Sequence, residues 1–329
     1  SIGVAIGNAN TADAQELERN ADLALYQAKY GGKDRYQLYE PGLHADAVLR
    51  LAMTTELRKA LENDEIDVAY QPIVDVTTGG IAGVEALARW HHPTRGLLAP
   101  KDFIGIAESS GLIARLGARV MEKALAQSAV WQHSYRGHRE LRMSVNVSGR
   151  QLTRDTFVSE VAELLRTTDL DPATVVLEIT ESVLLPGEGV AYQRLAELHD
   201  LGVKVYIDDW GTGWSSLRHL DSLPVSGLKL AAEFVADLPG ERHSGLAKAV
   251  LDLSRSLGLE SVIAEGVEVP EQLQVLADLG YRLCQGYLTG TPQDADETAA
   301  LLATSTSAAW PEAPGRERML TGGDGGEPA

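Results

Sequence analysis

Short apolar runs alternate with amphipathic stretches along most of the chain. Helical spacing of apolar residues is clearest in Arg119–Trp131, Tyr192–Leu201 and Gly245–Leu257. Between such stretches lie eight runs with the composition of buried strands. These runs are Val68–Val76, Ile81–Trp90, Leu141–Ser148, Thr174–Thr180, Lys204–Trp210, Gly227–Ala231, Ser261–Val267 and Arg282–Leu288. Eight strands that alternate with helices over roughly 240 residues predict an α/β fold of the (β/α)8 barrel type, and a doubly wound open sheet fits the same alternation.

The first 60 residues follow a different pattern. Ser1–Gly7 reads as a buried strand, a helical pattern follows it, and Arg35–Tyr39 reads as a second short strand. One βαβ unit of about forty residues is too small to bury a core of its own. We therefore expect residues 1–41 to be the tail of a domain whose body precedes Ser1 in a longer protein. Apolar residues four positions apart in Leu43–Leu61 predict a connecting helix.

Composition narrows the classes of partner. The 329 residues include 29 Lys and Arg against 47 Asp and Glu, a formal charge of −18, which argues against a DNA or RNA duplex as the partner. The sequence contains neither a membrane-length apolar run nor a signal peptide, so we expect no membrane contact by these residues. The single cysteine, Cys284, fits a reducing cytoplasm. Whether a region upstream of Ser1 anchors the whole protein in a membrane stays open.

Polar residues stand at or near the ends of nearly all the predicted strands. They are Glu85, Asn146, Glu178, Asp208, Asp209, Lys229, Glu265 and Gln285. In a barrel these ends meet at one mouth, where barrel enzymes place their active sites. Carboxylates that converge there repel one another unless a cation lies among them, and a set of oxygen ligands suits Mg²⁺ or Mn²⁺.

Asp208 and Asp209 are adjacent in the sequence, and adjacent side chains point to opposite faces of a strand. They can share a site only where the strand breaks, which the following Gly211 favours. Such a pair suits the bridging of two metal ions, as in phosphodiester hydrolysis. Lys229 admits a Schiff-base role, but neighbouring carboxylates keep an amine protonated. Orienting an attacking water or contacting a phosphate fits Lys229 better.

Seven motifs follow one another between residues 70 and 288. They are Tyr70-Gln71-Pro72-Ile73-Val74, Glu85-Ala86-Leu87-Ala88-Arg89-Trp90, Asn146-Val147-Ser148, Glu178-Ile179-Thr180-Glu181, Asp208-Asp209-Trp210-Gly211-Thr212-Gly213, Glu265-Gly266-Val267-Glu268 and Gln285-Gly286-Tyr287-Leu288. Through this series, residues 56–302 resemble the EAL domain, the cyclic di-GMP phosphodiesterase of bacterial signalling. Residues 1–40 are similar to the end of a GGDEF (diguanylate cyclase-like) domain through Ser1-Ile2-Gly3 and Ala21–Lys29.

The two resemblances divide the chain into four segments. Residues 1–41 are the GGDEF-like remnant, 42–60 the linker helix, 61–302 the EAL barrel and 303–329 a tail that is predicted to be disordered because it is rich in Ser, Thr, Gly, Pro and Glu. The nucleotide-binding and catalytic part of the GGDEF domain is absent, so we expect no cyclase activity from the remnant.

The EAL resemblance implies a modified barrel with one antiparallel strand, two Mg²⁺ or Mn²⁺ ions and hydrolysis of cyclic di-GMP to linear pGpG. By position, it implies that the metal ligands are Glu85, Asn146, Glu178, Asp208 and Asp209. It implies Glu265, Lys229 and Asp209 as catalytic residues, with Lys229 positioning the nucleophile. It implies Arg89, Leu87, Glu268 and Gln285 at the substrate, with Arg89 on a phosphate. It also implies a homodimer through the barrel.

One position departs from the family's pattern. The family usually has Lys-x-Asp where this chain has Lys229-Leu230-Ala231, so an acid near the metals is lost. We expect a weakened phosphodiesterase. Two other functions stay open: a receptor that binds cyclic di-GMP without turnover and signals through the linker helix, and a protein-interaction module that has lost the ligand. The retained ligand set argues against the second.

Overall fold

The computed structural model describes residues 1–7, 13–30, 34–40, 43–135, 138, 140–184, 189–212 and 223–305. The tail beyond residue 305 and the motif residue Gly213 lie outside these described residues, so the expected disorder of the tail stays a prediction. The chain divides into two compact units. One comprises residues 1–66 with 90–116, and the other comprises 67–89 with 117–329.

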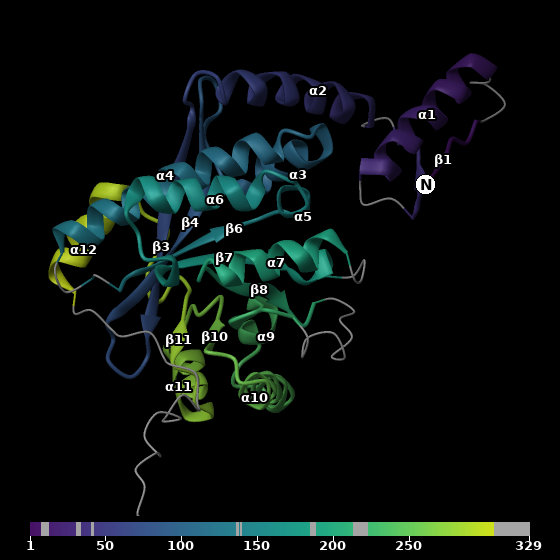
Figure 1. The fold of residues 1–329 in the computed structure, drawn as a ribbon. Coiled ribbons are helices and arrows are strands. Elements are labelled where there is room, and N and C mark those ends of the chain that lie inside the picture. Colours follow the sequence, from purple (N-terminus) through teal and green to yellow (C-terminus); the bar gives the residue numbers. More distant parts are fainter. Residues whose placement is uncertain are drawn as a thin grey trace, which may run out of the picture. The chain divides into compact units, whose positions relative to one another are not determined.

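The second unit is built on a barrel of eight strands, which Figure 1 shows in blue to yellow. The strands are β3 (Ile66–Asp75), β4 (Ile81–His92), β6 (Arg142–Asn146), β7 (Val175–Thr180), β8 (Lys204–Trp210), β9 (Gly227–Leu230), β10 (Ser261–Ala264) and β11 (Leu283–Cys284). Their order is β3-β11-β10-β9-β8-β7-β6-β4, and β3 also pairs with β4, which closes the ring. Neighbours from β4 to β11 run parallel, whereas β3 is antiparallel to both of its neighbours. The predicted barrel with one antiparallel strand is confirmed, and the open sheet is wrong.

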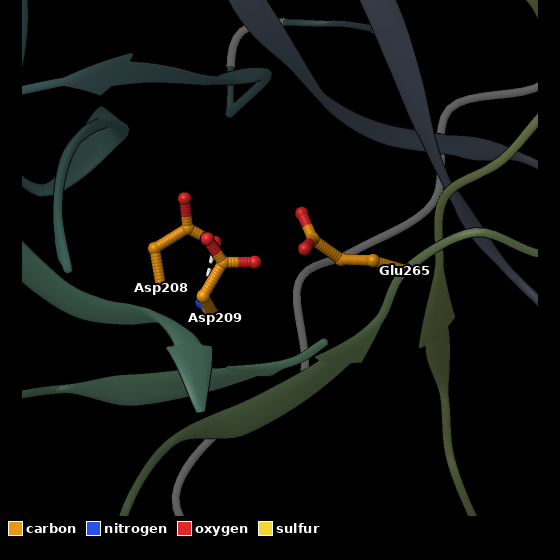
Figure 2. A group of neighbouring side chains, drawn as sticks. All are labelled: Asp208, Asp209 and Glu265. Atoms are coloured by element: carbon orange, nitrogen blue, oxygen red, sulfur yellow. Dashed lines mark hydrogen bonds between the residues drawn. The ribbon is translucent and has the colours of Figure 1, made fainter. Parts of the chain in front are cut away.

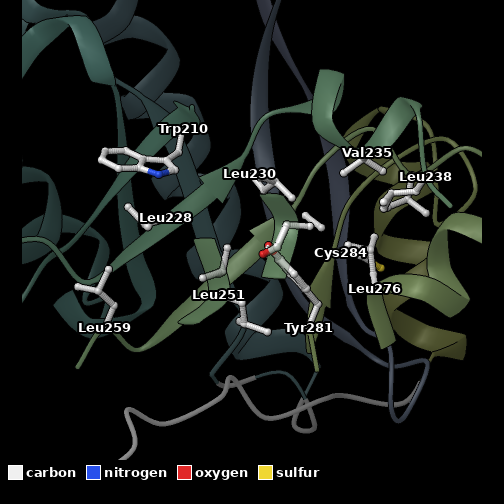
Figure 3. Close-up of a cluster of buried hydrophobic side chains, with 14 of the residues drawn as sticks. Trp210, Leu228, Leu230, Val235, Leu238, Leu251, Leu259, Leu276, Tyr281 and Cys284 are labelled. Atoms are coloured by element: carbon white, nitrogen blue, oxygen red, sulfur yellow. Dashed lines mark hydrogen bonds between the residues drawn. The ribbon is translucent and has the colours of Figure 1, made fainter. Parts of the chain in front are cut away.

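Helices connect the parallel strands. They are α4 (Ile113–Ser134), α5 (Gly149–Leu152), α6 (Phe157–Thr168), α7 (Val190–Asp200), α9 (Ala232–Ala236), α10 (Glu241–Ser256) and α11 (Pro270–Leu279), with the short 3-10 turns η2 (Pro172–Thr174) and η3 (Glu181–Leu184), and α12 (Ala295–Thr304) follows the last strand. Apolar residues of β8 to β11 pack against α9, α10 and α11 outside the barrel, where Leu228, Leu251 and Tyr281 are buried (Figure 3). Cys284 is fully buried in the same cluster, so it is a small core residue.

Inside the barrel, a layer of apolar side chains lies beneath the polar strand ends. Val176, Tyr206, Ile263 and Leu283 belong to this layer. Gly227 leaves room for the ring of Tyr206, because a Cβ there would lie 2.5 Å from a ring carbon. Side chains two residues apart in a strand point the same way. The residues two positions after this layer, which are Glu178, Asp208, Glu265 and Gln285, therefore reach the mouth of the barrel.

In the first unit, β1 (Ile2–Val4) pairs in parallel with β2 (Tyr36–Leu38), and α1 (Ala14–Tyr30) connects them. Gly3 permits close packing, since a Cβ there would lie 2.1 Å from the carbonyl oxygen of Ala21 in α1. The expectation that Ser1–Gly7 is buried is wrong: the side chains of Ile2 and Ile6 are 63% and 78% exposed. A single helix covers only one face of a two-stranded sheet.

The rest of the first unit contains α2 (Leu43–Ala60), α3 (Pro100–Ser110) and the short strand β5 (Gly96–Leu98), which pairs with the end of β4. The expected connecting helix is therefore present as α2. The sequence pattern gave no indication of β5. Among the residues that the structure describes, none of the helices is both long enough and apolar enough to cross a membrane.

Candidate active site

The ammonium group of Lys229 is the centre of the barrel mouth. Lys229 lies on β9, and its side chain is 1% exposed. Its Nζ atom contacts carboxylate oxygens of four residues, at 2.6 Å for Glu265 just after β10, 2.7 Å for Glu178 on β7, 3.2 Å for Glu85 on β4 and 3.5 Å for Asp208 on β8. The structure thus brings together the polar strand ends that the sequence analysis singled out.

The protonation state of Lys229 follows from these neighbours. Burial by itself lowers the pKa of Lys229, but the charges of Asp208, Glu178, Glu265 and Glu85 raise it well above the usual value for lysine. The amine is therefore an ammonium ion at neutral pH. A Schiff-base nucleophile must be deprotonated, so this geometry argues against the Schiff-base role of Lys229.

The buried carboxylates carry more negative charge than one lysine balances. Burial, together with the charges of Glu85 and Asp208, raises the pKa of Glu178 well above its usual value. Burial and the charge of Asp208 likewise raise the pKa of Glu265 to about 7. Glu178 Oε1 is buried and has no hydrogen-bond partner among the described residues. Among the described residues, the positive charge at the mouth is therefore too small to balance the carboxylates, and Glu178 Oε1 is a buried acceptor without a donor.

Asp208 and Asp209 stand where β8 breaks its regular pattern. The pairing of β8 with β9 shifts register between Ile207 and Trp210, and Asp209 has a φ of +53°. Both carboxylates therefore reach the same side, as the sequence analysis required. Figure 2 shows them facing Glu265, and one oxygen from each of the three residues lies within 4.8 Å of the others. Burial and the charge of Asp208 raise the pKa of Asp209.

Glu85 is held by two side-chain amides. Asn146 Nδ2 donates to Glu85 Oε1 at 2.6 Å, and Gln285 Nε2 donates to Glu85 Oε2 at 2.7 Å. Burial alone raises the pKa of Glu85, but Lys229 and these two amides outweigh it, so the pKa is lowered. Glu85 is therefore a fixed, ionised carboxylate at the mouth.

The candidate substrate residues other than Gln285 make other contacts. The half-buried guanidinium of Arg89 donates to the carbonyl oxygen of Ala88 at 2.9 Å, and burial lowers its pKa despite the nearby Glu85 and Tyr287. Leu87 is partly buried on β4, two residues before Arg89. The backbone N–H of Glu268 donates to Gln272 Oε1 at 2.8 Å, before α11. Ala231 directly precedes α9 and is 2% exposed.

Two motif residues received no role in the sequence analysis but have one in the structure. Glu181, at the start of η3, accepts a hydrogen bond from the backbone N–H of Gly211 at 3.3 Å and so holds the turn after Asp209. Gln71 on β3 accepts a hydrogen bond from Gln285 Nε2 at 3.1 Å. Both residues belong to the series of motifs in the sequence analysis, and only this membership indicated that they contribute to the site.

The donor set fits divalent cations. Five carboxylates (Glu85, Glu178, Asp208, Asp209 and Glu265) surround one ammonium group, and all of these ligand atoms are hard oxygens, which Mg²⁺ and Mn²⁺ prefer. The unpartnered Glu178 Oε1 adds an independent indication, because a buried carboxylate oxygen without a donor is costly unless a cation satisfies it.

Residues 54–292 match the family model described as the EAL domain. The chain is 36% identical over 304 residues to the bifunctional diguanylate cyclase/cyclic di-GMP phosphodiesterase MucR of Pseudomonas aeruginosa, covering 92% of this chain and 44% of that protein. It is 38% identical over 293 residues to the cyclic di-GMP phosphodiesterase NbdA of the same organism, covering 89% of this chain and 37% of NbdA. The chain thus spans less than half the length of these curated relatives.

Solved structures give the same picture. The MucR phosphodiesterase in complex with c-di-GMP superposes with a TM-score of 0.71 at 36% identity, covering 75% of this chain and 99% of that one. The EAL domain of Mycobacterium smegmatis DcpA superposes with a TM-score of 0.64 at 34% identity, covering 74% of this chain and 100% of that one.

Proposed function

The chain belongs to the EAL domain family, and on that premise we propose that it hydrolyses cyclic di-GMP to linear pGpG with two Mg²⁺ or Mn²⁺ ions. One observation supports this most strongly. In the part of the chain that the structure describes, five carboxylates converge on a mouth with a single ammonium group, and Glu178 Oε1 has no partner there. Such a site is built for cations, and cations in turn draw the phosphate of the substrate to an acidic mouth.

Each residue has a proposed role. Glu85, Asn146, Glu178 and Asp208 hold one cation, and Asp208 with Asp209 holds the other, with Glu265 beside them. Two such ions clamp the attacking and leaving oxygens of a phosphodiester and lower the pKa of a bound water. Lys229 keeps its proton and positions the nucleophile. Arg89 pairs with a phosphate, and Leu87, Glu268 and Gln285 line the substrate.

A second candidate function rests on Ala231. Because Ala231 stands where the family usually has an acid, the site loses one carboxylate next to the cluster, and turnover is expected to be weak. In the extreme case the domain is a receptor that binds cyclic di-GMP without cleaving it. The ligand set in the mouth favours the enzyme, and it counts against a pure protein-interaction module.

The other proposals concern the rest of the chain. A GGDEF-like origin for residues 1–41 is supported by the parallel β1–α1–β2 unit, and we expect no cyclase activity from it. The homodimer through the barrel and the cytoplasmic location stay predictions. Sedimentation of the purified protein with and without Mg²⁺ tests the dimer.

A turnover assay tests the proposed function. The protein is incubated with cyclic di-GMP in Mg²⁺, in Mn²⁺ or in EDTA, and the products are separated by chromatography. We expect pGpG only with metal, and none from Glu85→Gln. Glu163→Gln, an exposed glutamate on α6, serves as the matched control and keeps full activity. Tight binding without product supports the receptor, and neither binding nor product rules out both functions.

A further inference from the structure

Three consecutive residues of β3 hold the loop that follows β11. The backbone N–H of Tyr70 donates to the carbonyl oxygen of Gln293 at 2.7 Å, and the N–H of Gln293 donates back to Tyr70 at 3.0 Å. Gly290 has a φ of +151°, and a Cβ there would lie 3.0 Å from Pro72. Between these two contacts, Gln71 Nε2 donates to the carbonyl oxygen of Gly290 at 3.0 Å.

Gln71 also begins a chain of side-chain hydrogen bonds that ends at the mouth. Its Oε1 atom accepts from Gln285 Nε2 at 3.1 Å, and the same Nε2 donates to Glu85 Oε2 at 2.7 Å. All three side chains are buried, with exposed fractions of 8% for Gln71, 4% for Gln285 and 6% for Glu85. Water therefore does not compete strongly for these hydrogen bonds.

The hydrogen bonds from Gly290 through Gln71 and Gln285 to Glu85 are called the relay below. The groups at its two ends determine which way each amide is turned. The carbonyl oxygen of Gly290 can only accept, so Gln71 must turn its NH2 group toward it and its oxygen toward Gln285. Gln285 Nε2 donates both to Gln71 Oε1 and to Glu85 Oε2, so Gln285 presents its NH2 group to both neighbours. A flip of either amide would set two oxygens against each other, and hence the two glutamines support a single arrangement.

We propose that Gln71 is a positioning residue for the cation site, which acts through Gln285 to hold the carboxylate of Glu85 in place. Within the described residues, the side-chain hydrogen bonds of Gln71 go to Gly290 and Gln285, so its effect on Glu85 passes through the amide of Gln285. The inference rests on the proposed cation-dependent function, because Glu85 is a ligand only if that function holds. The inference also explains the Tyr70-Gln71-Pro72 motif in structural terms, because these residues of β3 contact the loop after β11.

Manganese binding measured by calorimetry tests the relay without any turnover. We expect Gln71→Leu to lower the Mn²⁺ affinity roughly tenfold, as is common for the partners of metal ligands, and Gln285→Leu to lower it at least as much. Because the effect of Gln71 passes through Gln285, the variant with both Gln71→Leu and Gln285→Leu should bind Mn²⁺ with the same affinity as Gln285→Leu alone. Gln132→Leu is the matched control: Gln132 also donates to a carbonyl oxygen, that of Leu141, but at the opposite end of β6, and its loss should leave the affinity unchanged.

Additive losses in the double variant, or an unchanged affinity in Gln71→Leu, would overturn the inference. If the unaltered protein binds no Mn²⁺, the proposed function fails, and the relay is then judged in the metal-free protein by NMR. There, the side-chain amide protons of Gln285 should both exchange slowly, and Gln71→Leu should speed the exchange of one of them. Equal exchange in both proteins would overturn the relay itself. Gln71→Met, which keeps the length of the side chain, replaces Gln71→Leu if the latter does not fold.

Discussion

Lys229 Nζ lies 2.7 Å from Glu178 Oε2, and both side chains are almost completely buried. This pair lies inside a larger cluster in which three further carboxylates, those of Glu85, Asp208 and Glu265, share the same ammonium group and a fourth, that of Asp209, lies beside them. In the metal-free protein, the positive charge of Lys229 therefore offsets the repulsion between the carboxylates of the mouth.

Replacing Lys229 by methionine should destabilise the metal-free protein strongly. Removing one partner of a buried ion pair leaves an uncompensated charge and typically costs about 3–5 kcal/mol of unfolding free energy. Urea unfolding in EDTA measures this cost. Lys248→Met, which removes an exposed ion pair with Asp252, should cost at most about 1 kcal/mol. Adding Mn²⁺ should recover part of the loss in Lys229→Met, because the cation binds only the folded mouth. A loss no larger than in Lys248→Met would contradict the central role of Lys229.

Replacing Ala231 by aspartate should strengthen the enzyme. Ala231 directly follows Leu230 of β9, whose carbonyl oxygen accepts a hydrogen bond from the N–H of Glu265, so a carboxylate there joins the edge of the cluster. We expect the turnover of cyclic di-GMP to rise by about tenfold, the scale of a residue that supports metal ligands. Ala236→Asp adds the same charge at the far end of α9 and should change the rate little. An unchanged or lower rate in Ala231→Asp would show that the missing acid does not limit this chain.

Replacing Arg89 by methionine tests its proposed contact with phosphate. Arg89 is half-buried and donates within the described chain only to backbone carbonyl oxygens, so its charge is available to a ligand. Losing one charge-assisted hydrogen bond should raise KM by about tenfold or more, with a smaller change in kcat. Steady-state kinetics measures the two effects, with the exposed Arg166→Met as the control. A fall in kcat at constant KM would contradict a simple binding role.

Cys284 should be unreactive in the folded protein. Burial raises the pKa of its thiol to about 12, and the charge of Asp75 adds to the shift. Below the ordinary thiol pKa of 9.0 both folded and unfolded states are protonated, so the full stability is present. As the pH rises toward about 12, the unfolded thiol ionises first and the stability falls. A thiol reagent at pH about 8 should label Cys284 only after unfolding in urea. Rapid labelling of the folded protein would contradict the packing in Figure 3.

The alternation of strands and helices was predictable from the sequence because the strands are apolar on both faces and the helices are amphipathic, whereas the closure of the strands into a barrel with one antiparallel strand was expected only from the family resemblance. The ends of the strands were less predictable. Glu265 is the one charged residue in the run Ser261–Val267, yet β10 ends at Ala264, and Gly266 takes a positive φ of +69°. Likewise β11 covers only Leu283–Cys284 of the predicted Arg282–Leu288. Glu265 and Gln285 stand just beyond these two ends, where the backbone leaves the regular ladder.

The members of the site were also predictable, but their partners were not. A polar residue at each strand end indicates a shared mouth, whereas nothing in the spacing shows that Lys229 contacts four carboxylates at once. The link from Gln71 to Gln285 joins residues 214 positions apart in the sequence. It depends on the closure of the barrel by the antiparallel strand β3, and no local pattern reports that closure.

Hydrolysis in water enriched in oxygen-18 tests the account most directly. The protein is mixed with cyclic di-GMP and Mn²⁺, and the product is analysed by mass spectrometry. We expect linear pGpG with one oxygen-18 atom in its terminal phosphate, and we expect Glu178→Gln to abolish and EDTA to suppress its formation. Cyclic di-GMP that is bound but unchanged, or a linear product that forms equally well in EDTA, would contradict the claim that this mouth is a cation-dependent phosphodiesterase.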